Sequence, residues 1–122
     1  MSESSILDLQ CEAEMQEMEQ HYAQVIEEKT EEFEELRQKQ EDIAPIKDAV
    51  YSLCGHIEDS KYFDGWYPMA NELFSPIWST ASKIDDGIDS LKIKISNLEE
   101  ARERARLRIP LKYEQMKQDS DN

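Results

Sequence analysis

The residues whose types and spacing could do chemistry are acidic pairs and a few possible metal ligands. Glu27-Glu28, Glu31-Glu32 and Glu34-Glu35 lie close together, and paired carboxylates can serve as acid–base groups or metal ligands. A di-iron helical bundle also needs Glu-x-x-His spacing on facing helices, and the only two histidines, His21 and His56, do not have it. We therefore expect a solvated acidic face and no metal.

The cysteines and glycines form no recognised motif either. Cys54 and His56 are two potential zinc ligands, but no second pair follows at a zinc-site spacing. We interpret Cys11 and Cys54 as buried small hydrophobic residues in a reducing compartment, with a disulfide between them as the alternative. The three glycines form no phosphate-binding loop, and no Gly-x-Ser-x-Gly pattern occurs. The sequence thus predicts no catalytic residue, no cofactor and no enzyme.

The charge limits the partners that the chain can bind. Its 122 residues carry a formal net charge of -14, which repels phosphate backbones and anionic lipid surfaces. No apolar run approaches the ~20 residues of a membrane span, and the N-terminus lacks the features of a signal peptide. We expect a cytoplasmic protein that binds no nucleic acid and inserts into no membrane, with export by a signal-independent route left open.

The sequence contains two heptad seams, that is, two stripes of apolar residues at coiled-coil spacing, and these seams define the helices on which the residues above lie. Alternate steps of 4 and 3 give a first seam in which 11 of 14 positions are apolar: Cys11, Met15, Met18, Tyr22, Val25, Lys29, Glu32, Leu36, Lys39, Ile43, Ile46, Val50, Leu53 and Ile57. The second seam is apolar at 11 of 12 positions: Ala70, Phe74, Ile77, Ala81, Ile84, Ile88, Leu91, Ile95, Leu98, Arg102, Ala105 and Ile109. Near the exceptions in the first seam, Ile26 and Phe33 lie one residue over, which predicts a local stutter.

Together the seams predict one all-α domain, 1–122, folded as a long, coiled-coil-like antiparallel two-helix hairpin. The first helix is expected over about 6–58, an aromatic bend over 59–67, the second helix over about 68–109 and a polar tail over 110–122, because Pro110 should end the helix. Kinks are expected at Pro45 and at Ser75-Pro76, and a break at Pro45 would give three helices.

Charge supports the antiparallel arrangement. Folding back would place a basic cluster, Arg102, Arg104, Arg106 and Arg108, beside the acidic residues Glu17, Glu19, Glu27 and Glu28 of the first helix. Each such surface pair contributes little, but several together disfavour the parallel orientation.

The bend carries more aromatic residues than a bare connection needs. Tyr62, Phe63, Trp66, Tyr67, Phe74 and Trp78 fall within 17 residues. These rings could seal the hairpin end, or they could bind a partner, since Trp and Tyr dominate interface hot spots. We predict a partner-binding tip formed by Phe63, Trp66, Tyr67, Phe74 and Trp78.

The layout resembles a known family of small helical hairpins. Asp64-Gly65-Trp66 in the bend, followed by Ala70, Phe74 and the second seam, resembles the WXG-type proteins of bacterial type VII secretion and the accessory proteins of their LXG toxins. The family's Trp-x-Gly appears here as Gly65-Trp66, in the opposite order, and Tyr113 is followed four residues later by Lys117 where the export signal has an acidic residue. The resemblance therefore implies a chaperone or toxin-targeting role in preference to that of a secreted substrate.

These observations predict a non-catalytic adaptor or targeting subunit that binds helices of a partner protein. The motivating feature is a set of apolar residues off the main seams, which a two-helix hairpin cannot bury alone: Ile6, Ile26, Phe33, Leu73, Ile93 and Leu107. We expect a hetero-complex, with a homodimer as the close alternative. Two other hypotheses remain: a structural coiled-coil subunit of a larger assembly, and an acidic nucleic-acid mimic that inhibits a DNA-binding protein.

Overall fold

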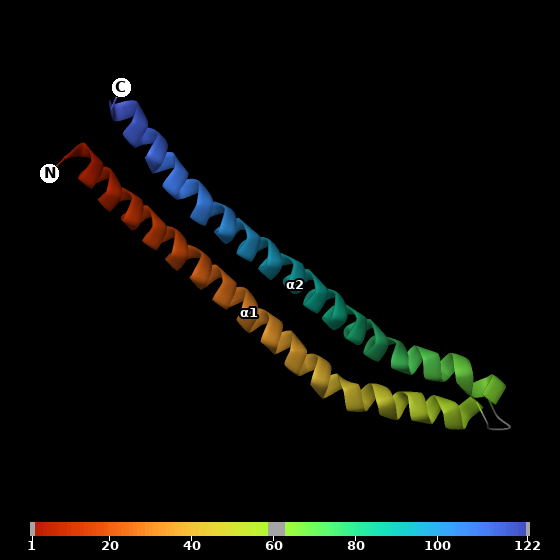
Figure 1. Cartoon of the computed structure of the whole chain (residues 1–122). Coiled ribbons are helices and arrows are strands. Elements are labelled where there is room, and N and C mark those ends of the chain that lie inside the picture. The colour runs from red at the N-terminus through yellow and green to blue at the C-terminus, as the bar shows by residue number, and fades with distance from the viewer. Residues whose placement is uncertain (1, 59–62, 122) are drawn as a thin grey trace. The chain divides into compact units, whose positions relative to one another are not determined.

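The chain is an all-α two-helix hairpin, as its seams predict. The computed structural model describes residues 2–58 and 63–121, without the side chains of residues 57–70 and 121. Helix α1 spans Glu3–Glu58 and helix α2 spans Phe63–Asp121 (Figure 1). Ser2 is the only described residue outside a helix, and its hydroxyl caps α1 by accepting a hydrogen bond of 3.2 Å from the backbone N–H of Ser5.

Prolines do not interrupt either helix. Pro45 lies inside α1, so the three-helix alternative is wrong. Pro76 and Pro110 lie inside α2, so the expected helix end at Pro110 and the tail over 110–122 are also wrong. All three side chains are exposed, and the backbone groups that proline leaves unpaired on a solvent-facing side can bond to water.

Packing explains why α2 continues past Pro110. Ile109 is only 4% exposed, and Tyr113, one turn beyond the proline, packs against the cluster that Ile109 forms with Met18 and Ala105. An interior proline costs about 3 kcal/mol. Burial of these side chains offsets that cost. The prediction of a helix end at Pro110 considered only the local backbone preference and not this burial.

Helix α2 also begins earlier than expected, at Phe63 instead of near Pro68. The first N–H groups of a helix have no partner within the helix, so Gly65 and Pro68 disturb few hydrogen bonds in its first two turns. The rest of the predicted aromatic bend, residues 59–62, lies outside the described residues.

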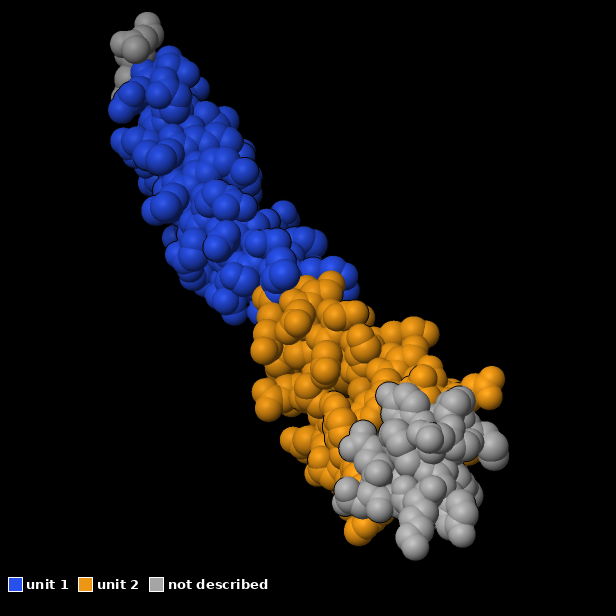
Figure 2. Space-filling model, turned by 90° about the vertical axis from the view of Figure 1, so that its right-hand side faces the viewer, with its two compact units in different colours: residues 1–30, 93–122 blue, residues 31–92 orange. Residues whose placement is uncertain are grey.

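The hairpin comprises two compact units, coloured blue and orange in Figure 2, and each contains residues of both helices. Unit 1 consists of residues 1–30 and 93–122, and unit 2 of residues 31–92. Within unit 1, Asp8, Glu14 and Glu19 pair with Lys117, Lys112 and Arg106, so positions rise along α1 as they fall along α2. Within unit 2, Gln40 bonds to Asp85 and Tyr51 contacts Trp78 in the same antiparallel order.

The second seam forms most of the core. Every one of its described side chains, from Phe74 to Ile109, is buried or half-buried. Among the described side chains, the buried residues of unit 2 are Val50, Ala81, Ile84, Ile88 and Leu91, and those of unit 1 are Met18, Ala105 and Ile109. Ala70 and Ile57, the ends of the two seams at the bend, lie outside the described side chains.

The first seam departs from its predicted register in unit 2. Up to Lys29 the predicted positions are buried or half-buried, but the covered positions then run through Phe33, Leu36, Gln40, Ile43, Lys47, Val50 and Cys54. Two successive steps of four, from Val25 to Lys29 and on to Phe33, constitute the stutter. The prediction placed the stutter correctly, and Leu36, Ile43 and Val50 are covered as expected, but the alternate positions of the seam lie one residue later in the structure than the prediction put them. Glu32 and Lys39 consequently lie exposed.

Candidate protein-binding surface

The shifted register exposes three large apolar side chains on unit 2. Ile46 is 51% exposed, Leu53 48% and Leu73 68%. The prediction that Ile46 and Leu53 lie in the seam is wrong, because Lys47 and Cys54 take the inward positions one residue later. We call Ile46, Leu53 and Leu73 the apolar flank.

Helix geometry places these residues on one side of unit 2. Successive residues of a helix are rotated by about 100°. On α1, Ile46 and Leu53 therefore lie on one side of the covered stripe and Tyr51 lies on the other side. On α2, Leu73 lies on one side of the covered stripe and Trp78 lies on the other. Tyr51 and Trp78 contact each other, with ring centroids 4.6 Å apart and planes tilted by 47°. Since that contact marks one flank, the three aliphatic side chains share the other.

The predicted aromatic tip is only partly described. The side chains of Phe63, Trp66 and Tyr67 lie outside the described residues, so their role stays a prediction. Phe74 is half-buried at its seam position. Trp78 is also half-buried, and its ring contacts the exposed Tyr51 on the opposite flank from Leu73.

The off-seam apolar residues divide into two groups. Leu73, Ile93, Leu107 and Ile6 are exposed, whereas Ile26 and Phe33 are half-buried at the stutter. Sequence reasoning missed further exposed residues: Leu9, Ile46, Tyr51, Leu53, Leu111 and Met116. Following the register set by Phe33 beyond the stutter would have found Ile46 and Leu53.

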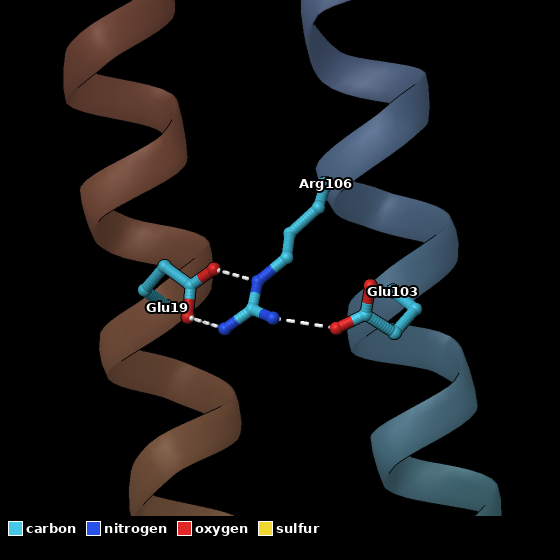
Figure 3. A network of polar contacts seen from close by, with 3 residues as sticks. All are labelled: Glu19, Glu103 and Arg106. Carbon is cyan, nitrogen blue, oxygen red and sulfur yellow. Dashed lines mark hydrogen bonds and ion pairs between the residues drawn. The ribbon is translucent and has the colours of Figure 1, made fainter.

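The charged residues of unit 1 form a cross-helix network with a structural role. Arg106 donates to both carboxylate oxygens of Glu19, one bond measuring 2.8 Å, and to Glu103 at 2.5 Å (Figure 3). The hydrogen bond from Arg106 holds the pKa of Glu19 below its ordinary value, and Glu19 in turn raises the pKa of Arg106. This pair matches the expectation that the arginine cluster lies beside the acidic first helix.

Two more pairs continue the network toward the chain ends. Lys112 donates to Glu14 at 2.6 and 2.7 Å, and this bond, followed by one from Tyr113, lowers the pKa of Glu14. Glu14 raises the pKa of Tyr113, since the neutral phenol is the donor. Lys117 donates to Asp8, which raises the pKa of the lysine. The network supports the antiparallel alignment of the helices, and its groups are paired with each other.

The described residues contain no cluster of metal-ligating side chains beside these ion pairs. Over residues 2–58 and 63–121, no group of three or more His, Cys, Asp or Glu side chains could hold a metal ion. Cys11 and Cys54 are free and half-buried. Among the described residues, no helix is both long and apolar enough to cross a membrane.

No protein-family model, curated protein or solved structure matches the chain.

Proposed function

We propose that the chain is a non-catalytic interaction module, an adaptor or targeting subunit, which binds a helix of a partner protein through the apolar flank of unit 2. The observation that carries the proposal is the exposure of Ile46, Leu53 and Leu73 on one side of a narrow hairpin. Aliphatic side chains at helical spacing are the usual receptor for an amphipathic helix.

The register shift strengthens this argument. A seam through Ile46 and Leu53 would bury two aliphatic side chains, whereas the structure covers Lys47 and Cys54 instead. Places where the local pattern and the fold disagree are often functional, because the stability given up there serves another purpose. A partner helix that covers the flank would recover the apolar burial.

The more specific form of the proposal is an accessory protein of type VII secretion that targets an LXG toxin. It is supported by the resemblance of Asp64-Gly65-Trp66 and the second seam to that family. In this form the partner helix belongs to the toxin, and Trp66 would extend the contact from the flank to the bend.

The test is purification of the tagged full-length chain from its native host, with identification of the bound proteins. Leu53→Lys combined with Leu73→Lys should abolish the complex without changing the helical circular dichroism spectrum, since both side chains are exposed. Lys92→Leu, a change at an exposed position off the flank, serves as the matched control. A complex that survives the double substitution would exclude the flank as the binding surface.

Salt separates this function from nucleic-acid mimicry. Binding through apolar side chains should persist at about 1 M NaCl, where the Debye length is about 3 Å, whereas binding by a mimic should collapse. Trp66→Ala then tests the predicted tip: weakened binding with an unchanged melt supports a contact role, and a lowered melt with unchanged affinity supports a sealing role.

A further inference from the structure

A second exposed surface lies on unit 1, along the outer side of α2. Leu107 and Leu111 are 70% and 68% exposed. Leu107 is two residues from both Ala105 and Ile109, which are 3% and 4% exposed, so at 100° per residue it points away from the core. Continuing from these leucines in steps of 4 and 3 gives what we call the outer stripe, all of it exposed: Glu100, Arg104, Leu107, Leu111, Glu114 and Gln118.

The outer stripe is complementary to itself when reversed. If two copies pack antiparallel about a two-fold axis near position 109, Leu107 of one copy faces Leu111 of the second, and Arg104 faces Glu114. Glu100 then faces Gln118. A parallel pairing would instead place Arg104 on Arg104 and Glu114 on Glu114. Charge therefore selects the antiparallel arrangement, and symmetry supplies each favourable pair twice.

One charged group of the outer stripe, Arg104, makes no ion pair in the described part of the free chain, whereas Glu114 lies close enough to Lys117 to help raise the pKa of that lysine. Arg106 is engaged by Glu19 and Glu103, but no ion pair of Arg104 occurs among the described residues. Arg104 and Arg108 are like charges four residues apart, which destabilises a helix slightly, and Glu100, four residues before Arg104, offsets part of that repulsion. A carboxylate from outside the chain would relieve this repulsion and would lie beside two exposed leucines.

We propose that the chain forms an antiparallel homodimer through the outer stripe. Two features oppose it: the net charge of -14 on each copy, and the approach of the two Arg108 side chains near the axis. Because the contact is also short, we expect a weak dimer that forms only at high protein concentration. The contact uses unit 1 alone, so it does not depend on the function proposed for the apolar flank.

Sedimentation velocity of the full chain at about 1 to 200 μM tests the dimer. We expect a concentration-dependent shift from monomer to dimer, and at least a tenfold weakening in Leu107→Lys with an unchanged circular dichroism spectrum. Lys94→Leu, at an exposed position off the stripe, is the control and should dimerise as the unaltered chain does. A chain that stays monomeric at 200 μM, or a dimer that Leu107→Lys leaves unchanged, would overturn the proposal.

A charge exchange tests the register. Arg104→Glu alone and Glu114→Arg alone should each weaken the dimer at least tenfold, because each places like charges opposite one another. The double variant should dimerise again, and an equal mixture of the two single variants should form a heterodimer with both pairs restored. Absence of both the rescue and the heterodimer would contradict the antiparallel register.

Discussion

The two units hold the same pair of helices together by different means. In unit 1 the described cross-helix contacts include ion pairs at Asp8, Glu14 and Glu19, and the core contains Ala105 among its few buried residues. Unit 2 has more buried aliphatic side chains and a close fit at Gly87. The difference indicates that ion pairs contribute more to the alignment of the helices in unit 1, whereas apolar packing contributes more in unit 2.

The largest expected effect comes from a charge in the core of unit 2. Leu91 is 7% exposed, so Leu91→Asp should cost more than about 4 kcal/mol and abolish the cooperative melt followed by circular dichroism. Ile93→Asp, two residues away at a side chain 63% exposed, is the matched control and should change stability by less than about 1 kcal/mol. Equal melts for the two variants would contradict the assigned seam.

A smaller effect, of opposite sign, is expected at the polar exception in the core of unit 1. The buried Nε of Arg102 has no hydrogen-bond partner. Arg102→Leu should therefore stabilise the chain by about 1 kcal/mol in urea unfolding, because an apolar side chain at this seam position leaves no donor unsatisfied. Lys94→Leu, at an exposed position, should give no such gain. A destabilised Arg102→Leu variant would show that the guanidinium contributes favourably to the seam.

Gly55 and Gly87, both in unit 2, test the effect of helix propensity separately from that of side-chain fit. A Cβ at Gly55 would meet nothing within 4 Å, so Gly55→Ala should stabilise the chain by about 0.5 to 1 kcal/mol. A Cβ at Gly87 would lie 2.9 Å from Cδ1 of Leu36, so Gly87→Ala should lose most of that gain as Leu36 shifts. Urea unfolding of both variants measures the difference, and equal stabilisation would show that the fit at Gly87 is loose.

The smallest effect concerns pH and the ion pairs of unit 1. Because the folded pKa values of Glu14 and Glu19 are lowered from 4.5, their contribution is present above that value and is lost as pH falls through the folded pKa values. A Glu14→Gln, Glu19→Gln variant should melt lower at pH 7 but lose less stability between pH 5 and pH 3. An acid dependence equal to that of the unaltered chain would show that these pairs do not set it.

At alkaline pH the stability contributed by the ion pairs and hydrogen bonds of unit 1 changes with pH in the opposite direction. The pKa of Tyr113 is raised from 10.0 and that of Lys117 from 10.5, so their contribution is present below these values and is lost as pH rises through the folded pKa values. Both tryptophans, Trp66 and Trp78, belong to unit 2, so their fluorescence follows that unit while circular dichroism follows the whole chain. If, at high pH, the circular dichroism melt begins at a lower temperature than the fluorescence melt, unit 1 unfolds before unit 2.

The helical class, the two elements and their antiparallel order could be predicted because they depend on periodicity that repeats over many heptads. The second seam could be predicted residue by residue, since it is apolar at nearly every position and tolerates no second register. The pairing of Arg106 with Glu19 followed from the same alignment. The proposed interaction surfaces were predicted less well, because they depend on which of two neighbouring residues turns outward.

The amino-acid sequence by itself determined that two helices form and which face of α2 turns inward, since helix period and apolar spacing act locally and add along the chain. Only the tertiary structure decided the register of α1 beyond Lys29 and the passage of α2 through Pro110. Near Phe33 two stripes that share Leu36, Ile43 and Val50 are nearly equivalent in sequence, and the structure covers Phe33, Lys47 and Cys54 in place of Glu32, Ile46 and Leu53. At Pro110 the local backbone preference is outweighed by packing of Ile109 and Tyr113 against residues about a hundred positions away in the chain.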